Sequence, residues 1–436
     1  MARALTPDID RMSADWTMLC ETIGERLAGT DSERHAADYI KSSFDAAGCD
    51  DCRIEFFDCV SRRKATSSVE FFDGKKWERV DSQSMTGSAS TRGGQTVEGE
   101  IVWLEMPEQG SRLKKNSLSG KIALLFGPMP DNVDLHKRLV AAKPLAVIHV
   151  DHRLPFSWAK SDGVFPLWTK KYGMPPTVSV PFTDAWRWRQ TGVSKVRVSA
   201  DITLVPATST NIIADLKGNS PSDEMILLGA HHDTQANSVG ADDNASGVVA
   251  LLELARLLKP LKRRRTIRLV SFGTEEQLSV GSSAYVLKHR SELKSIVLMV
   301  NFDSFASPVG HTTMVCAGGA DLAEFGLSEM KRRGVCATVK NQVIPYADHF
   351  PFSAFGVPAL WFYRENFPGG RWQHHSRFDN LDNVSVSAAS EIIAAAGGMI
   401  ASASRMEQLP FKHKPSAAFK SQTRHYAVTL FGFDVK

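Results

Sequence analysis

From Asn211 onward, apolar runs of strand length alternate with segments whose apolar residues recur at helical spacing. This alternation is typical of an α/β domain in which a mixed, largely parallel sheet is flanked by helices on both faces. The runs are continuous enough for strands that are buried on both sides. The expected elements are strands at 225–230, 267–272, 296–302, 357–362 and 426–435, the last at an edge, and helices at 245–258, 320–333 and 386–404.

The first 50 residues predict two amphipathic helices. One apolar stripe lies within residues 9–23, and a second lies within residues 36–44. Thr30 or Asp31 is expected to cap the second helix. A strand at 53–57 follows.

Between about residues 60 and 205 the pattern changes to short alternating runs separated by Gly, Pro, Asp and Ser, which favours a small β-rich module. The N-terminal helices have no evident partner within this module, whereas the α/β pattern resumes after it. We therefore expect a discontinuous main domain, 1–60 and 205–436, with an inserted domain at 61–204.

The composition agrees with two folded domains. The chain of 436 residues exceeds the size at which a single core usually keeps growing, and its 43% hydrophobic and 23% charged residues fit a globular protein. The net charge of +4 is small and spread along the chain, so no nucleic-acid partner is expected.

The N-terminal segment has acidic residues where a signal peptide would need an apolar stretch, and no later segment reaches the length of a membrane span. We therefore expect a cytoplasmic protein without a membrane partner. The oligomeric state stays open, and a homo-oligomer is compatible with the sequence.

Two further clusters have plain interpretations. Cys49 and Cys52, with Cys59 nearby, have no fourth metal ligand, so reduced thiols are expected. The basic run 262–265 lies between a predicted helix and a predicted strand, and is interpreted as a solvated loop, with an anion contact as the alternative.

Chemistry-bearing residues follow the predicted strands. His231 and Asp233 come directly after the strand 225–230, at the carboxyl edge where open α/β sheets bind ligands. Two residues apart on an extended chain, they project to one side. His231 can then bind a metal while Asp233 holds its other ring nitrogen.

Two acidic pairs come next. Asp242 and Asp243 precede a helix whose cap requires only one carboxylate. Glu275 and Glu276 follow the strand 267–272, and adjacent carboxylates there would repel each other unless a cation separated their roles. With a metal present, one glutamate ligates and the other takes a proton from bound water.

Asp303 ends another apolar strand, and His375 follows a Gly-rich loop. No single motif is decisive, but together the five candidate ligands have the nitrogen and oxygen donors that zinc prefers. These ligands are His231, Asp243, Glu276, Asp303 and His375.

The order of these motifs, with His375-Ser-Arg-Phe-Asp379 last, resembles the co-catalytic zinc aminopeptidase family, metallopeptidase family twenty-eight. The match spans about residues 20–55 and 205–400. The resemblance implies a zinc exopeptidase fold and two zinc ions, with His231 and Asp303 on one zinc and Glu276 and His375 on the other. It also implies that Asp243 bridges them and that Glu275 is the general base, while Asp379 orients His375 or caps the segment after it.

The family also suggests that residues 98–182 resemble a protease-associated module. The activity implied is hydrolysis of an amide bond, with removal of an N-terminal residue from small peptides preferred. The alternatives are a glutamate-carboxypeptidase-like enzyme, a small-molecule amidase, a glutaminyl cyclase and a non-catalytic binding relative. For substrate contact the candidates are Arg364, Arg371 and Trp372, which a solvated or structural role would also explain.

Overall fold

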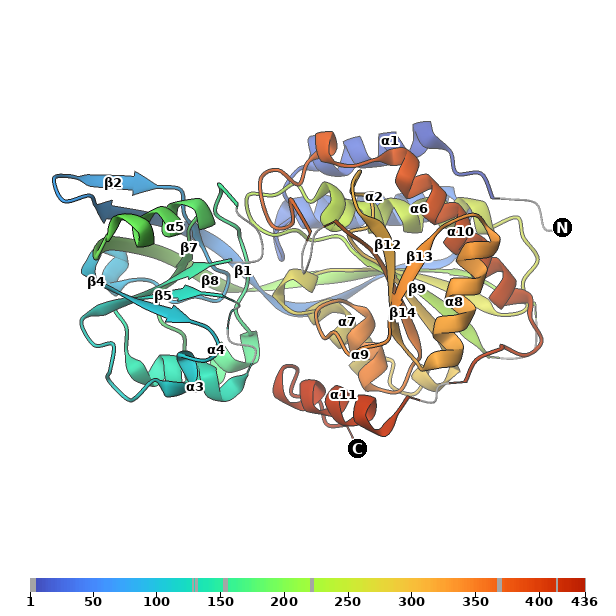
Figure 1. The fold of residues 1–436 in the computed structure, drawn as a ribbon. Helices are drawn as coiled ribbons and strands as arrows, with labels where there is room; N and C mark the ends of the chain where they lie inside the picture. The colour runs from blue at the N-terminus through green and yellow to red at the C-terminus, as the bar shows by residue number, and fades with distance from the viewer. Residues whose placement is uncertain are drawn as a thin grey trace. The chain divides into compact units, whose positions relative to one another are not determined.

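The computed structural model describes residues 5–127, 129, 132–151, 156–219, 223–366, 371–412 and 415–435, which fold into two compact units. Unit 1 comprises 1–59, 207–367 and 377–436, and unit 2 comprises 60–206 and 368–376. The two longest strands, β1 (Asp50–Phe72) and β8 (Lys195–Leu216), pass from one unit into the other (Figure 1). The short segment 368–376 was not expected to group with the insertion.

Unit 1 is built on a mixed sheet with the strand order β13-β12-β14-β11-β9-β10-β8. Its central strands β9, β10, β11 and β14 are parallel, whereas β8 and β12 pair in the antiparallel sense. The fold class is therefore the expected one. The strands are β9 (Met225–His231), β10 (Thr266–Phe272), β11 (Ile296–Phe302), β12 (His311–Ala317), β13 (Ala337–Lys340) and β14 (Ala359–Glu365).

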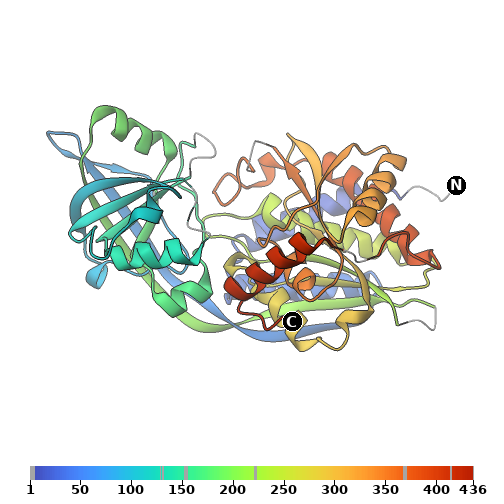
Figure 2. The same cartoon turned by 60° about the horizontal axis from the view of Figure 1, so that its bottom comes forward.

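Both faces of this sheet are buried because alternate residues of each strand enter separate cores. Ile226 and Leu228 of β9 face the core that is covered by α1, α2, α6, α8 and α10, whereas Leu227 faces α7, α9 and α11 (Figures 1 and 2). The helices are α1 (Ile9–Thr17), α2 (Asp31–Ala46), α6 (Ser246–Leu258), α7 (Val280–Lys288), α8 (Ala320–Arg332), α9 (His349–Ala354), α10 (Val386–Arg405) and α11 (Ala417–Thr429).

The N-terminal helices form as the apolar stripes predict. The first continues beyond α1 as a π-helical turn, η1 (Met18–Ile23), and Thr30 caps α2 by accepting a hydrogen bond from the Glu33 N–H. Trp16 and Phe44 are buried in the same core as α6.

Helix α10 contradicts the expectation that no segment reaches the length of a membrane span. Its 20 residues are apolar enough to cross a membrane by length and composition. In the structure α10 packs against α1, α6 and α8, and residues such as Ile393 and Ile400 are fully buried in that core.

The expected edge strand at 426–435 is wrong. Residues 417–429 form α11, and Ser416 caps it by accepting a hydrogen bond from the Phe419 N–H on its hydroxyl. Ala427 and Leu430 are buried three residues apart, which is helical spacing.

The basic run 262–265 is solvated only in part, because Lys262 and Arg264 are exposed whereas Arg265 is buried and pairs with the Glu224 carboxylate at 2.8 Å. Arg263 donates to the carbonyls of Leu258 and Lys259 at the end of α6, and Arg265 donates to the Ala403 carbonyl near the end of α10. Both arginines thus satisfy carbonyl groups that a helix C-terminus leaves without a partner.

Unit 2 contains more helix than the expected β-rich module. Its sheet has the order β8-β4-β5-β6-β7-β3, with β4 to β7 parallel, and helices cover both faces. That this unit is protease-associated-like stays a prediction. Its elements are β2 (Trp77–Val80), β3 (Gln83–Ser84), β4 (Val97–Glu105), β5 (Lys121–Phe126), α3 (Val133–Ala142), β6 (Ala146–Val150), α4 (Pro166–Tyr172), β7 (Thr177–Ser179) and α5 (Phe182–Thr191).

Candidate metal centre

The ends of three parallel neighbours bring most of the candidate residues of unit 1 to one edge of the sheet. Strand β9 ends at His231, β11 is followed by Asp303, and β10 is followed after two residues by Glu275. Since β9 lies between β10 and β11, His231 is flanked by the other two.

His231, Asp243 and Asp303 converge tightly. His231 Nε2 lies 3.1 Å from Asp243 Oδ1 and 3.9 Å from Asp303 Oδ2, and one donor atom from each residue lies within 4.8 Å of the others. All three side chains are buried. Carboxylate oxygens of Asp243 and Asp303 thus surround His231 Nε2, as they would around a cation bound to this nitrogen.

The electrostatics of this cluster favour positive charge. Burial would lower the pKa of His231, but contacts with Asp233 and Asp243 and the charges of Glu275 and Asp303 raise it well above its ordinary value. A site that stabilises an imidazolium in this way also attracts a metal cation, since both balance the same carboxylates.

Asp233 holds two parts of the centre together. The backbone carbonyl of Asp233 is 3.1 Å from His231 Nδ1, and its Oδ1 is 3.5 Å from the same nitrogen. The carboxylate also accepts the backbone N–H of Glu275 at 2.9 Å and that of Glu276 at 3.2 Å. Asp233 therefore contacts the imidazole as expected, and in addition fixes the turn that carries both glutamates.

That turn has a strained backbone. Thr274 adopts φ 56°, a left-handed conformation that is costly for a β-branched residue. The conformation presents the next two N–H groups to the single carboxylate of Asp233. Hydrogen bonds to a charged acceptor, worth about 1.5–3 kcal/mol each, are large enough to offset such strain.

Glu275 is placed to act as a base beside the cluster. Its Oε2 lies 3.8 Å from His231 Nε2, and its Oε1 accepts a hydrogen bond from Ser279 Oγ at 3.1 Å. Burial, opposed by the charge of His231, raises the pKa of Glu275 well above its ordinary value, and Asp348 and Asp303 raise it further.

Asp379 contacts a segment that was not considered for it, while its expected role toward His375 or the segment after it stays a prediction. Its Oδ1 accepts the backbone N–H of Asp242 at 2.6 Å, and its Oδ2 accepts that of Asp243 at 3.0 Å. Asp379 therefore stabilises the earlier segment, η4 (Ala241–Ala245), which carries the candidate bridging ligand.

Close packing brings Asp243 toward Asp303. A Cβ atom added to Gly247 would lie 2.2 Å from the Phe302 carbonyl oxygen, so only glycine allows α6 to approach the end of β11. Asn244 spans the same contact, because its Nδ2 donates to Phe302 O and its Oδ1 accepts the Gly247 N–H.

His375 lies in the segment 368–376, which is grouped with unit 2. There its Nδ1 is 3.6 Å from Asp162 Oδ1, and its carbonyl accepts the Ser161 N–H at 2.9 Å. Its ring stacks on His374 with the centroids 3.4 Å apart. Its membership of the metal centre stays a prediction.

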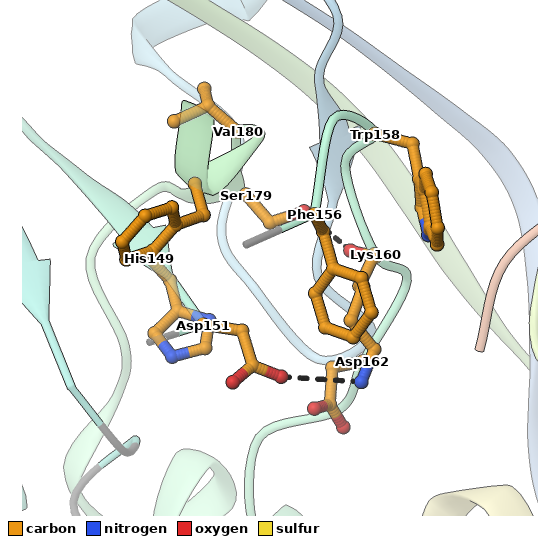
Figure 3. Close-up of a pocket in the computed structure, with 9 residues that line it drawn as sticks. His149, Asp151, Phe156, Trp158, Lys160, Asp162, Ser179 and Val180 are labelled. Carbon is orange, nitrogen blue, oxygen red and sulfur yellow. Dashed lines mark hydrogen bonds and ion pairs between the residues drawn. The ribbon is translucent and has the colours of Figure 1, made fainter. Parts of the chain in front are cut away.

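Figure 3 shows a small cavity in unit 2 near Asp162, with a volume of about 10 Å³. Lys160 lies beside the carboxylates of Asp151 and Asp162 in this view, and its Nζ is 3.2 Å from Asp151 Oδ2. A volume this small holds about one water molecule, so the cavity is not a substrate pocket.

The three residues expected to contact substrate have structural contacts. Arg364 donates to the Gly310 carbonyl at 2.7 Å, and Arg371 contacts His374. Trp372 meets Trp158 edge-on with the ring centroids 6.0 Å apart. A substrate role for these three residues stays a prediction.

Several supporting residues were not found from the sequence. Ser279 and Asn244 are short polar residues of ordinary type, and Asp162 lies more than 200 residues from the imidazole that it contacts. The only available signal was that Asn244 and Ser279 lie within four residues of a candidate ligand or base.

Comparison with known proteins agrees with this chemistry. Residues 211–399 match the model of Peptidase family M28. Over 433 residues, the chain is 26% identical to aminopeptidase YwaD of Bacillus subtilis, and the alignment covers 95% of this chain and 88% of that protein.

Solved structures share the fold. A zinc aminopeptidase of Bacillus subtilis, BSAP, superposes with a TM-score of 0.74 and 21% identity, and 95% of this chain and 100% of that one are covered. A peptidase M28 precursor of Shewanella amazonensis gives a TM-score of 0.77 and 19% identity, with 94% and 98% covered. The buried imidazole and carboxylate cluster is the donor set of a zinc metallopeptidase, and over residues 211–399 the chain is similar to Peptidase family M28.

Proposed function

We propose that the protein is an aminopeptidase that removes the N-terminal residue of small peptides with the help of two zinc ions. The observation that carries this proposal is the convergence of His231, Asp243 and Asp303 beside the buried carboxyl group of Glu275. The name of the Bacillus subtilis relative supports the choice of an aminopeptidase over an amidase or a carboxypeptidase.

The donor set fits the proposed ions. His231 and Asp303 would hold one zinc, Glu276 and His375 would hold the other, and Asp243 would lie between them.

Bound zinc supplies Lewis acidity and lowers the pKa of a bound water. The protein supplies the proton transfer. Glu275 has one carboxylate oxygen held by Ser279 and the other directed toward the cluster, so it takes a proton at Oε2 and delivers it to the leaving amine.

The carboxypeptidase alternative receives no support from the candidate arginines. Such an enzyme needs a guanidinium that binds the substrate carboxylate, but the described contacts of Arg364 and Arg371 are to Gly310 and His374. We therefore keep the aminopeptidase as the single proposal.

The test compares the two adjacent glutamates. E275Q should retain zinc while kcat falls by about 10²–10⁴-fold, as expected for loss of a general base. E276Q should lose zinc as well as activity. Substrates would be aminoacyl-p-nitroanilides, with their N-acetylated forms as controls. Near-normal turnover by E275Q, or equal cleavage of the acetylated substrates, would refute the proposal.

A further inference from the structure

Arg26 is a fully buried arginine far from the candidate ligands in sequence, and it lies outside the segment that matches the family model. Its Nε donates to the His232 carbonyl at 2.7 Å, and its Nη1 donates to the Val239 carbonyl at 2.9 Å. Its Nη2 lies 3.4 Å from the Gly240 carbonyl. One side chain thus contacts both ends of the loop 232–240.

The backbone of Arg26 binds the same loop. The Arg26 N–H donates to Thr234 Oγ1 at 3.0 Å, and the Thr234 N–H donates to the Arg26 carbonyl at 3.1 Å. The same Nη1 that contacts Val239 also lies 2.9 Å from the carbonyl of Leu19, within η1, and 2.8 Å from that of Gly24, directly after η1. Arg26 therefore joins the N-terminal helical segment to the loop.

The loop 232–240 connects two candidate metal ligands, so the contacts of Arg26 with it bear on the metal centre. His231 lies directly before the loop, and Asp243 lies three residues after its end, yet the loop contains no regular secondary structure. Of the loop carbonyls that Arg26 contacts, that of Gly240 also accepts the Ala245 N–H of η4 at 2.8 Å, whereas those of His232 and Val239 lie outside any helix or strand. The relative position of the two ligands, 3.1 Å apart at their donor atoms, therefore depends on side-chain contacts of this kind.

Burying the charged guanidinium of Arg26 costs free energy, which its hydrogen bonds to the loop carbonyls must offset. No carboxylate in the described part of the chain lies within 4 Å of its guanidinium, and burial lowers its pKa. Asp233 and Asp379 oppose this effect through their charge. Burying a charge without a direct ion pair costs several kcal/mol unless hydrogen bonds compensate, and here backbone carbonyls supply those bonds.

We propose that Arg26 is a positioning residue for the metal centre: by binding both ends of the loop 232–240, it sets the distance between His231 and Asp243. This inference rests on the proposed metal function. Residues that position metal ligands typically change metal affinity by about 10–100-fold when they are replaced.

The experiment measures zinc affinity by competition with a chromophoric chelator, together with the melting temperature of the metal-free protein. R26K keeps the charge but not the planar donor fork, and R26M removes both. The matched control is R265M, because Arg265 is also buried and binds backbone carbonyls, but lies at the opposite end of β10, about 20 Å away.

We expect R26K and R26M to lose about 10–100-fold in zinc affinity, and R265M to lower the melting temperature without that loss. The visible spectrum of the cobalt(II)-substituted R26K protein should also differ from that of the wild type, since it reports coordination geometry. If R26M does not fold, the test uses R26K and T234A, and T234A should lose less zinc affinity than R26K.

Wild-type zinc affinity in R26K would overturn the inference, because charge alone would then suffice. An equal loss in R265M would also overturn it, because the effect would then be one of general stability. A wild-type protein that binds no zinc would instead refute the proposed function itself.

Discussion

Replacing Asp379 by asparagine tests how the backbone around Asp243 is held. Asp379 is 2% exposed, and its two carboxylate oxygens accept the N–H groups of Asp242 and Asp243 at 2.6 and 3.0 Å. Asparagine keeps the shape of the side chain. However, it presents an NH₂ group to one of these N–H donors, so one hydrogen bond is lost and the other becomes neutral.

The magnitude follows from these two bonds. A hydrogen bond to a charged acceptor contributes about 1.5–3 kcal/mol, and a neutral one contributes about 0.5–1.5 kcal/mol. The substitution should therefore lower the free energy of unfolding of the zinc-bound protein by about 2–4 kcal/mol. Of this, about 1.4–2.8 kcal/mol should appear as a 10–100-fold loss of zinc affinity, since Asp243 is displaced.

The assay combines chelator competition with urea unfolding in the presence and absence of zinc. D382N is the control, because Asp382 lies in the same loop and is exposed. D379N should lose more stability with zinc than without it, whereas D382N should lose little in either state. If D379N binds zinc as the wild type does, Asp379 does not position Asp243 and the reasoning is refuted.

Three further predictions concern other parts of the chain. Burial raises the pKa of Glu33 to about 8, so the folded state keeps a proton that the unfolded state loses, and the free energy of unfolding falls as the pH rises from about 5 to 8. E33Q should flatten this pH dependence in urea unfolding of the metal-free protein. An unchanged pH dependence would exclude Glu33 as its source. R263M should lower the free energy of unfolding by about 1–3 kcal/mol by removing the cap of α6, measured by urea unfolding, with zinc affinity unchanged. D162N should reduce the zinc content per chain by loosening His375, and an unchanged metal content by elemental analysis would count against that role.

The ends of the strands in unit 1 could be predicted because two independent signals coincide there. The run before His231 is apolar enough for a strand buried on both faces, and the residues after it are polar and acidic. The same holds for β10 before Glu275 and for β11 before Asp303. Parallel pairing then places all three at one edge, which a sequence pattern can imply.

The residues that hold the ligands could not be predicted in the same way. Arg26 lies in a short turn near the N-terminus, and a lone arginine in a turn is usually solvated. Asp379 was considered for His375 or the segment after it because both are near in sequence. It also accepts the N–H groups of Asp242 and Asp243, more than 130 residues earlier, which no local pattern indicated. Such pairings depend on tertiary contacts that have no periodicity.

Local pattern also misled at two places. The residues 426–435 alternate well enough to suggest a strand. However, Tyr426 and Ala427 belong to helix α11, and Ala427 is buried in the same core as residues of α9. In unit 2, short apolar runs were assigned to strands while the helices α3, α4 and α5 were missed. Helices of 7 to 10 residues carry too few turns for a clear period of 3.6.

The segment that matches the family model and the segment that builds the metal centre are therefore not the same. Residues 211–399 include every candidate ligand and the base. Yet the loop between His231 and Asp243 is held by Arg26, and Trp16 donates to the Ala241 carbonyl at 2.8 Å directly after that loop. The N-terminal helices are thus part of the support of the centre, which predicts that substitutions there change metal binding without touching a ligand.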